Sequence, residues 1–199
     1  MAGKFVAISD ILNVVQRDKD YYDNSGGGVT FSGGEAFVQF DGLMELLSGC
    51  KKAGIHTAIE TCGQVAPDKI KQAFPLVDLF LFDIKHTDKD ILKKTTGADL
   101  DLVLDNLRFI AANNPEKVII RVPVIPGFNN DLQEIENIFN LALRLNVKRV
   151  DLLPYHVLGK TKYEQLGRNY SFPYDSMLPK EALIPLKEMG EKMGLEVYL

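Results

Sequence analysis

The chain has 199 residues, of which 46% are hydrophobic, so it is long enough to bury a substantial core, and a single domain over residues 1–199 is expected. Its formal net charge of −4 gives no electrostatic basis for binding nucleic acid or an anionic membrane surface. No stretch approaches membrane-spanning length, and no basic region followed by an apolar run opens the chain, so we expect a cytoplasmic protein.

The predicted elements begin with a short helix that Ser9 is expected to cap, followed by a polar, glycine-rich connection over residues 18–28. From residue 28 onward, short runs of β-branched and aromatic residues alternate with longer amphipathic segments, which is typical of βα units and a parallel sheet. Six strands are predicted, at Gly28–Ser32, Ile55–Thr61, Leu79–Lys85, Val118–Ile125, Arg149–Tyr155 and Leu195–Leu199.

The amphipathic segments between these strands are expected to form helices that cover the sheet. They lie over residues 40–50, 100–110, 131–145 and 179–193. Asp131 marks the N-terminus of the third of these helices. Residues 159–178 have a loop-like composition, which indicates a flap near a functional site.

Parallel strands joined by helices form either a closed barrel or an open doubly wound sheet, and both place function at the carboxyl ends of the strands. Polar residues are costly inside buried parallel strands, so they should gather where each strand ends. These strand ends carry Ser32-Gly33-Gly34-Glu35, Glu60-Thr61, Asp83-Ile84-Lys85-His86, Arg121, and Asp151 through His156. A single charge of this kind is readily explained as a solvated loop residue, but five polar strand ends together favour a shared site.

The most specific signal is the segment GGGVTFSGGEAF over residues 26–37. Gly33 and Gly34 follow a buried strand and would let backbone groups approach a ligand. A carboxylate, Glu35, beside exposed backbone suits a ligand with an ammonium group, and neither GxxxxGK[ST] nor GxGxxG occurs to indicate phosphate binding. The alternative is a tight turn that needs positive φ, with an incidental glutamate, and glycine content alone favours that interpretation.

Four blocks, GGVTFSGGE, DIK, VIIRVPVIPGFN and LLPYH, occur in this order at the strand ends. In sequence and spacing they resemble the activating enzymes of glycyl-radical enzymes, which are radical S-adenosylmethionine proteins typified by pyruvate formate-lyase activating enzyme. The similarity covers nearly the whole chain, although Ala36 stands where the family usually has proline. The resemblance implies an α/β fold, an incomplete (β/α)6 partial TIM-type barrel of parallel strands, of which this chain lacks the first strand.

The same resemblance implies a [4Fe–4S] cluster held by a CxxxCxxC loop, with S-adenosylmethionine bound at its fourth iron. This sequence contains no such motif, and its two cysteines, Cys50 and Cys62, have neither disulfide-framework nor CxxC spacing. Both are expected to be reduced thiols rather than cluster ligands, because a cluster requires several thiolates. The cluster ligands are therefore expected to be absent, and this chain alone is expected to be inactive.

The resemblance further implies one site for S-adenosylmethionine, with a monovalent cation beside it. The GGE residues would hold the methionine amino group, and the DIK residues would contact the amino-acid and ribose region. The arginine would bind a carboxylate, and the histidine would lie against the adenosine. These cofactor residues are Gly33, Gly34, Glu35, Asp83, Lys85, Arg121 and His156, and the cation residues are Glu60, Thr61 and Asp83. His56 and His86 are left outside the site. No residue is expected to act as an acid or base, because the cofactors supply the reactivity.

The leading hypothesis is an oxidoreductase that uses S-adenosylmethionine and the cluster to generate a glycyl radical on a partner enzyme. By resemblance, pyruvate formate-lyase is the expected partner and a flavodoxin or ferredoxin the expected electron donor. A second hypothesis is a cluster-less relative that binds an adenosyl ligand or a partner protein without radical chemistry, and the sequence upstream of the Met1 codon separates these two. A third is an aldolase-like barrel in which Lys85 forms a Schiff base, which borohydride trapping would test.

Overall fold

A computed structural model describes residues 4–157, 163, 167, 169 and 177–199. The chain divides into two compact units, which we call unit 1 (Met1–Asp83 with Ala98–Ile119) and unit 2 (Ile84–Gly97 with Ile120–Leu199). The single domain over residues 1–199 stays a prediction, and the predicted loop over residues 159–178 lies largely outside the described residues. Within those described residues, no helix has the length and apolar character needed to cross a membrane.

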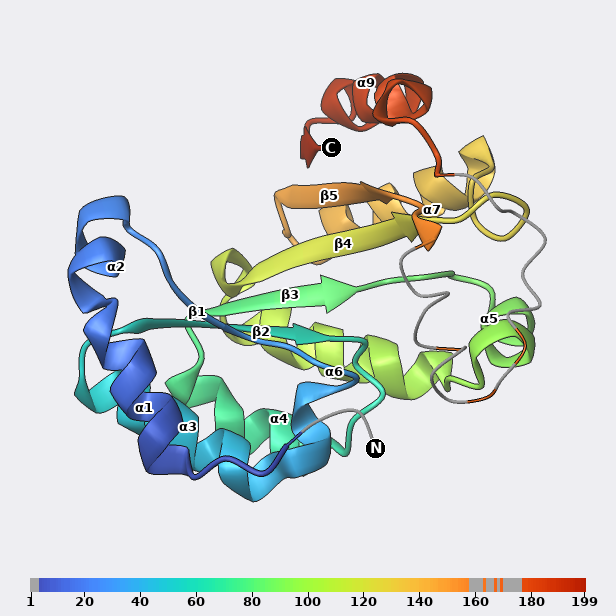
Figure 1. Ribbon diagram of the computed structural model, residues 1–199. Helices are drawn as coiled ribbons and strands as arrows, with labels where there is room; N and C mark the ends of the chain where they lie inside the picture. The colour runs from blue at the N-terminus through green and yellow to red at the C-terminus, as the bar shows by residue number, and fades with distance from the viewer. Residues whose placement is uncertain (1–3, 158–162, 164–166, 168, 170–176) are drawn as a thin grey trace. The chain divides into compact units, whose positions relative to one another are not determined.

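Unit 1 contains three strands that pair in parallel and in chain order (Figure 1). They are β1 (Gly28–Phe31), β2 (His56–Thr61) and β3 (Leu79–Asp83). Successive side chains of a strand point to opposite faces of the sheet. Ile59, Phe80 and Phe82 are fully buried on one face, while Glu60 and Asp83 are half-buried on the other.

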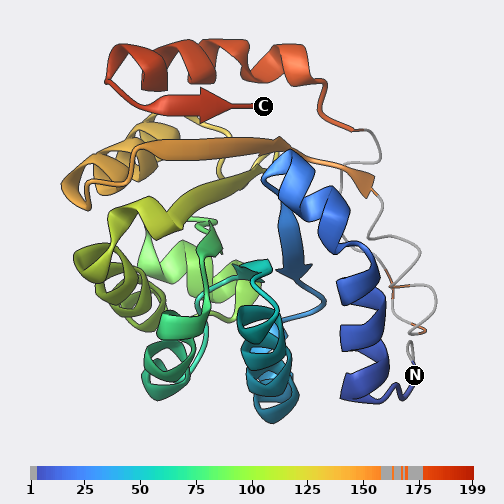
Figure 2. The ribbon, with the colours of Figure 1, turned by 90° about the vertical axis from the view of Figure 1, so that its left-hand side faces the viewer.

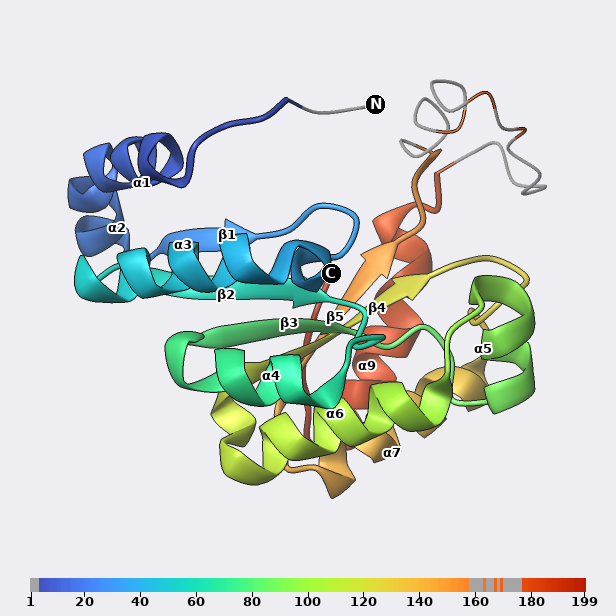
Figure 3. The same ribbon diagram turned by 90° about the horizontal axis from the view of Figure 1, so that it is seen from below.

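Helices of unit 1 pack on the face that carries Phe80, as Figure 3 shows for α3, α4 and α6. Phe74 links the layers, because its ring lies 6.3 Å from that of Phe80 and 5.7 Å from that of Phe109 on α6. Buried apolar side chains of the three helices complete this core. The helices of unit 1 are α1 (Ile8–Arg17), α2 (Lys19–Ser25), η1 (Ala36–Gln39), α3 (Phe40–Lys52), α4 (Pro67–Ala73), η2 (Phe74–Leu76), α6 (Leu100–Asn113) and η3 (Pro115–Lys117).

Two predictions for the N-terminal region are wrong. Ser9 does not cap the first helix, because α1 already begins at Ile8 after an extended Ala7 whose carbonyl accepts from the N–H groups of Asp10 and Ile11. The predicted connection over residues 18–28 contains α2, in which Lys19 and Asp23 form an ion pair of 2.7 Å across one helical turn. Local pairing of this kind lets a segment with few apolar residues form a short helix.

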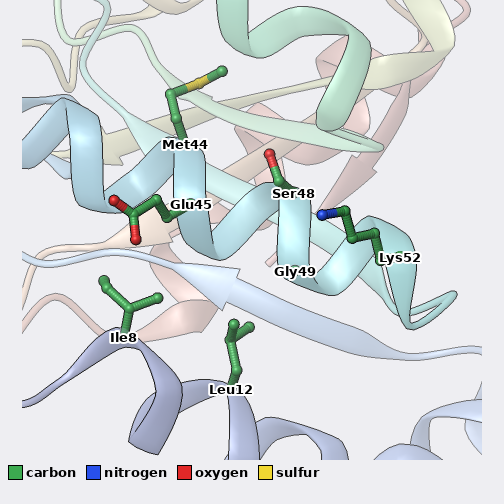
Figure 4. Close-up of a pocket in the computed structure, with 7 residues that line it drawn as sticks. All are labelled: Ile8, Leu12, Met44, Glu45, Ser48, Gly49 and Lys52. Atoms are coloured by element: carbon green, nitrogen blue, oxygen red, sulfur yellow. The ribbon is translucent and has the colours of Figure 1, made fainter.

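Helix α1 packs against α3 through apolar side chains on one of its faces. Ile8 and Leu12 point from α1 towards α3, as Figure 4 shows, and they line a cavity of about 500 Å³ together with Met44 and Ser48. Leu12 lies where α3 has Gly49, and a Cβ there would come within 2.6 Å of the leucine side chain. The absence of a side chain at residue 49 therefore allows the close contact between the two helices.

Unit 2 holds most of β4 (Val118–Val124) together with β5 (Arg149–Pro154) and β6 (Glu196–Tyr198), paired in parallel and in chain order. Its helices are α5 (Lys89–Thr96), α7 (Leu132–Arg144), η5 (Lys180–Leu183) and α9 (Ile184–Lys192). The predicted start of α7 is confirmed, because the Asp131 carboxylate accepts from the Glu134 N–H at 2.9 Å. Figure 2 shows α9 running along β6, which it contacts.

The α/β class with six parallel strands is confirmed, and every predicted strand lies within two residues of its observed bounds. Among the described residues, the strand order runs from β1 to β6 without a ladder that closes the sheet, as expected for a partial barrel. Parallel strands direct their carboxyl ends to the same edge of a sheet. Within each unit, this arrangement brings the carboxyl ends of the strands to one edge. Two residues predicted at strand ends, Arg121 and Asp151, instead lie inside β4 and β5.

Candidate functional site

The GGE loop leaves β1 at Phe31 with an exposed backbone. Gly33 has a φ of 141°, a backbone angle that residues other than glycine rarely adopt. A Cβ added to Gly34 would meet nothing within 4 Å, so the space beside this residue is open. Ser32 to Ala36 line a cavity of about 550 Å³ in unit 1, a volume suited to a small molecule. The loop therefore offers accessible backbone groups beside a carboxylate, as the sequence predicted.

The Glu35 carboxylate is held in place by donors from two segments. Its Oε2 accepts from the Thr61 hydroxyl at 3.0 Å, the Cys62 N–H at 3.0 Å and the Cys62 thiol at 3.3 Å. Its Oε1 accepts from the Phe37 N–H at 3.3 Å, at the start of η1. Neutral donors fix the orientation of a carboxylate without cancelling its charge, so Glu35 remains an anchor for a cation.

Glu60 and Asp83 lie on the face of the unit 1 sheet opposite to Thr61. The Glu60 carboxylate accepts a hydrogen bond from the Ser32 hydroxyl, which joins the ends of β1 and β2. The Thr61 side chain is buried and hydrogen-bonded to Glu35 and to the Gly63 N–H. The cation site of Glu60, Thr61 and Asp83 stays a prediction. Because the Thr61 side chain points to the other face, Thr61 would contribute backbone atoms to such a site.

The remaining cofactor residues, Lys85, Arg121 and His156, belong to unit 2. The Ile84 N–H donates to the Arg121 carbonyl at 2.9 Å, which places Lys85 beside β4. Arg121 pairs in register with Asp151 on β5, and His156 is exposed just beyond the end of that strand. A single site formed by all seven cofactor residues stays a prediction, because they are divided between the two units.

Sequence reasoning missed a buried polar cluster in unit 2. Glu134 is 5% exposed, and its carboxylate accepts from the Thr87 N–H at 2.5 Å and the Thr87 hydroxyl at 2.9 Å. His86, also 5% exposed, accepts the Asp88 N–H at Nδ1 and lies 3.4 Å from Glu134. The cluster borders a cavity of about 400 Å³. His86 therefore supports the loop after β3, and His56, at the exposed start of β2, lies away from the GGE end.

Two buried asparagines were also missed. Asn129 in unit 2 donates to the carbonyls of Lys85 and Pro123 at 2.8 and 2.9 Å and accepts the Ile125 N–H at 2.7 Å. Asn106 in unit 1 lies in the apolar stripe of α6 and bonds to the turn after β2. A polar residue at a buried position of an amphipathic helix was the available signal for Asn106.

The two cysteines lie in different surroundings. Cys50 is fully buried in α3, so it is a core residue, and burial raises the pKa of its thiol. Cys62 follows β2 and contacts Glu35.

Within the described part of the chain, no three His, Cys, Asp or Glu side chains are grouped to hold a metal ion. These residues thus do not fit an iron–sulfur cluster, and the absence of cluster ligands from the protein stays a prediction.

Residues 2–142 match the family described as the Radical SAM superfamily, and the chain belongs to that superfamily. Members of this class use S-adenosylmethionine and a [4Fe–4S] cluster. The curated relatives described next are each named as an activating enzyme. The chain is 40% identical over 174 residues to the choline trimethylamine-lyase activating enzyme of Oleidesulfovibrio alaskensis, which covers 85% of this chain and 56% of that protein. It is 34% identical over 200 residues to the 4-hydroxyphenylacetate decarboxylase activating enzyme of Clostridioides difficile, covering 100% and 63%.

One solved structure belongs to a protein with a similar name. A domain of pyruvate-formate lyase-activating enzyme from Bacteroides vulgatus ATCC 8482 is 26% identical, with a TM-score of 0.68, and the match covers 86% of this chain and 97% of that one. Streptococcus suis SuiB bound to S-adenosylmethionine shares the fold alone, at 14% identity and a TM-score of 0.73, over 98% of this chain and 43% of that one. The chain spans 56% and 63% of the two curated relatives above.

Proposed function

We propose that this chain is the S-adenosylmethionine-binding part of an enzyme that activates a glycyl-radical enzyme. The observation that carries the proposal is the GGE loop, where exposed backbone at Gly33 and Gly34 adjoins a fixed carboxylate at Glu35. The names of the curated relatives support it, since they are activating enzymes. They give no support to the cluster-less binder or to the aldolase-like barrel with a Schiff base on Lys85.

The residues of the chain would bind and orient the cofactor. In the proposal, the Glu35 carboxylate accepts from the ammonium group, which takes the place of the long contact from the Cys62 thiol at 3.3 Å. Asp83 and Lys85 contact the amino-acid and ribose region, Arg121 a carboxylate, and His156 the adenosine. S-adenosylmethionine, when bound, supplies the radical chemistry, and the protein contributes orientation and the exclusion of water.

The partner in this proposal is a glycyl-radical enzyme. Relatives are named for choline trimethylamine-lyase, 4-hydroxyphenylacetate decarboxylase and trans-4-hydroxy-L-proline dehydratase, so the partner class is broader than pyruvate formate-lyase. A flavodoxin or ferredoxin remains the proposed electron donor. A cytoplasmic location is proposed with it, because that compartment keeps thiols reduced.

Calorimetric titration of the chain with two ligands tests the ammonium contact. S-adenosylmethionine carries the amino-acid group, whereas 5′-methylthioadenosine lacks it. Glu35→Gln should weaken S-adenosylmethionine binding by about tenfold or more, the scale of one hydrogen bond to a charged group, and leave 5′-methylthioadenosine binding unchanged. Glu45→Gln, at an exposed position of α3, is the matched control. Unaltered affinity of Glu35→Gln, or no binding by the parent chain, would overturn the proposal.

The activation step needs a separate assay. The protein expressed from its complete reading frame is reconstituted anaerobically with iron and sulfide and mixed with a candidate glycyl-radical enzyme. A glycyl-radical signal in electron paramagnetic resonance, dependent on added S-adenosylmethionine, is the expected result. Persistent absence of that signal with each partner class named by the relatives contradicts the activating role.

A further inference from the structure

Asn106 occupies a position on α6 where an apolar residue would be expected. It is 1% exposed and lies on the same helical face as Val103 and Ile110, which are also buried. Its Nδ2 donates to the carbonyl oxygens of Gly63, at 2.9 Å, and Val65, at 2.7 Å. A buried amide is costly unless its donors are satisfied, and both N–H groups of this amide bond to one turn.

That turn carries the donors that hold Glu35. The Gly63 N–H donates to the Thr61 hydroxyl at 3.1 Å, and Thr61 and the Cys62 N–H each donate to Glu35 at 3.0 Å. Gly63 has a φ of 73°, and a Cβ there would come within 2.3 Å of the Phe82 ring. Residue 63 therefore has to be glycine, which is conformationally free, so the path of the turn depends on the groups that bond to its carbonyls.

Helix α6 contacts the same turn at a second point. The Asp99 N–H, at the beginning of α6, donates to the Gln64 side chain at 2.8 Å. The first turn of α6 and Asn106 thus hold residues 63–65 from two positions along one helix. Because the turn is bonded to α6 at both points, the position of α6 determines where Thr61 and Cys62 lie relative to the Glu35 carboxylate.

We propose that Asn106 is a positioning residue for the cofactor site. It fixes the backbone of residues 61–65, so that Thr61 and Cys62 hold the Glu35 carboxylate in the orientation that receives the ammonium group of the ligand. Asn106 itself does not contact the ligand. The inference rests on the proposed function of Glu35, and it adds a buried residue outside the predicted site to the set that determines affinity.

Alkylation of Cys62 reports on the turn without any ligand. Asn106→Asp keeps the side-chain shape, but it replaces Nδ2, which carries both donor hydrogens, with an oxygen that repels the Gly63 and Val65 carbonyls. N-ethylmaleimide should then modify Cys62 about tenfold faster than in the parent chain, because a thiol freed from a fixed turn is more accessible. Peptide mass spectrometry assigns the modified cysteine. Cys50, fully buried, should stay unmodified and so shows that the core is intact.

Asn113→Asp is the matched control, because Asn113 is exposed on the same helix and bonds only locally to the Phe109 carbonyl at 2.8 Å. Its rate of Cys62 alkylation should equal that of the parent chain. Asn106→Ser serves where the aspartate variant does not fold, since its hydroxyl keeps one donor and should give a smaller change in the same direction. An unchanged rate in a folded Asn106 variant overturns the inference.

Ligand affinity separates positioning from simple stabilisation. Asn106→Asp should weaken S-adenosylmethionine binding by about tenfold in the folded protein, and far less in a Glu35→Gln background, because coupled residues are not additive. If Asn106 has only a structural role, Asn106→Asp should lower the unfolding temperature and leave the affinity for S-adenosylmethionine unchanged. That result would overturn the inference.

The same titrations distinguish a failed inference from a failed proposed function. If Glu35→Gln weakens binding but Asn106→Asp does not, the proposed function stands and only the inference falls. If the parent chain does not bind S-adenosylmethionine, or Glu35→Gln binds it normally, both fall.

Discussion

The Thr61 hydroxyl lies 3.0 Å from Glu35 Oε2 and accepts the Gly63 N–H at 3.1 Å. One buried hydroxyl thus joins the GGE loop, at the end of β1, to the turn at the end of β2. Both of its hydrogen-bonding roles are used within the protein. The carboxylate that we assign to the ligand is therefore part of a structural network, so changes at Thr61 should affect stability as well as binding.

Thr61→Val tests this network, because valine has nearly the shape of threonine but lacks the hydroxyl. The substitution removes a donor from Glu35 and an acceptor from the Gly63 N–H, so the free energy of unfolding should fall by about 1–3 kcal/mol. Urea unfolding measures the change. Thr61→Ser keeps the hydroxyl and is the control. A loss in Thr61→Ser with none in Thr61→Val would show that the methyl group, not the hydroxyl, matters.

Glu134 should be important for the stability of unit 2. Its carboxylate accepts two hydrogen bonds from Thr87, and its side chain is 5% exposed. Glu134→Ala leaves these donors without their acceptor and creates a small cavity, so we expect a loss of about 2–4 kcal/mol in the free energy of unfolding. Glu136→Ala, at an exposed position of the same helix, should cost well under about 1 kcal/mol. Similar losses for both substitutions would contradict the assignment.

The number of strands and their bounds could be predicted because the signals are local. Apolar runs of strand length recur between amphipathic segments, and each observed strand falls inside its predicted range. The beginning of α7 was predicted for the same reason, since Asp131 bonds to a residue only three positions away. The helices α2, α4 and α5 were not predicted, because they have seven or eight residues each and little room for a periodic apolar pattern.

The sequence proposes residues for the candidate site, which stay a prediction, and it does not specify the contacts that hold them. Glu35 was expected to face a ligand, and its partners Thr61 and Cys62 lie 26 and 27 residues further along the chain. Asn106 bonds to residues 41 and 43 positions away, and Glu134 to Thr87 over 47 positions. Contacts over such separations follow from how helices pack on the sheet, which periodicity does not specify.

Leu12 should anchor α1 to α3. Its side chain lies against Gly49 and lines the cavity between the two helices. Leu12→Ala removes this contact at a half-buried position, so the free energy of unfolding should fall by about 1–2 kcal/mol. Val14→Ala, on the same helix at a side chain that is 57% exposed, should have little effect. If chemical denaturation finds the two variants equally stable, α1 is not anchored through Leu12.

Lys117 should make the stability of the protein depend on alkaline pH. Its Nζ donates to the Val77 carbonyl at 2.6 Å and lies 4.8 Å from the centre of the Phe74 ring. Burial lowers the pKa of this lysine, with Asp78 opposing the shift and Lys51 adding to it. The unfolded chain then binds the proton more tightly than the folded protein between the folded pKa and the ordinary value of 10.5. Stability therefore rises with pH through that window, because a penalty for the buried charge is relieved there.

Lys117→Met removes this titration while keeping an unbranched apolar stem of similar reach. The free energy of unfolding of the parent chain minus that of the variant should increase as the pH is raised towards the ordinary lysine value of 10.5, because the folded protein loses this proton below that value. Lys71→Met provides the control for loss of a lysine, since Lys71 is exposed on α4 beside Asp68. A difference for Lys117→Met that is flat, or that falls with pH, would mean that burial does not penalise the Lys117 charge, and the close contact with Val77 would then be an ordinary surface hydrogen bond.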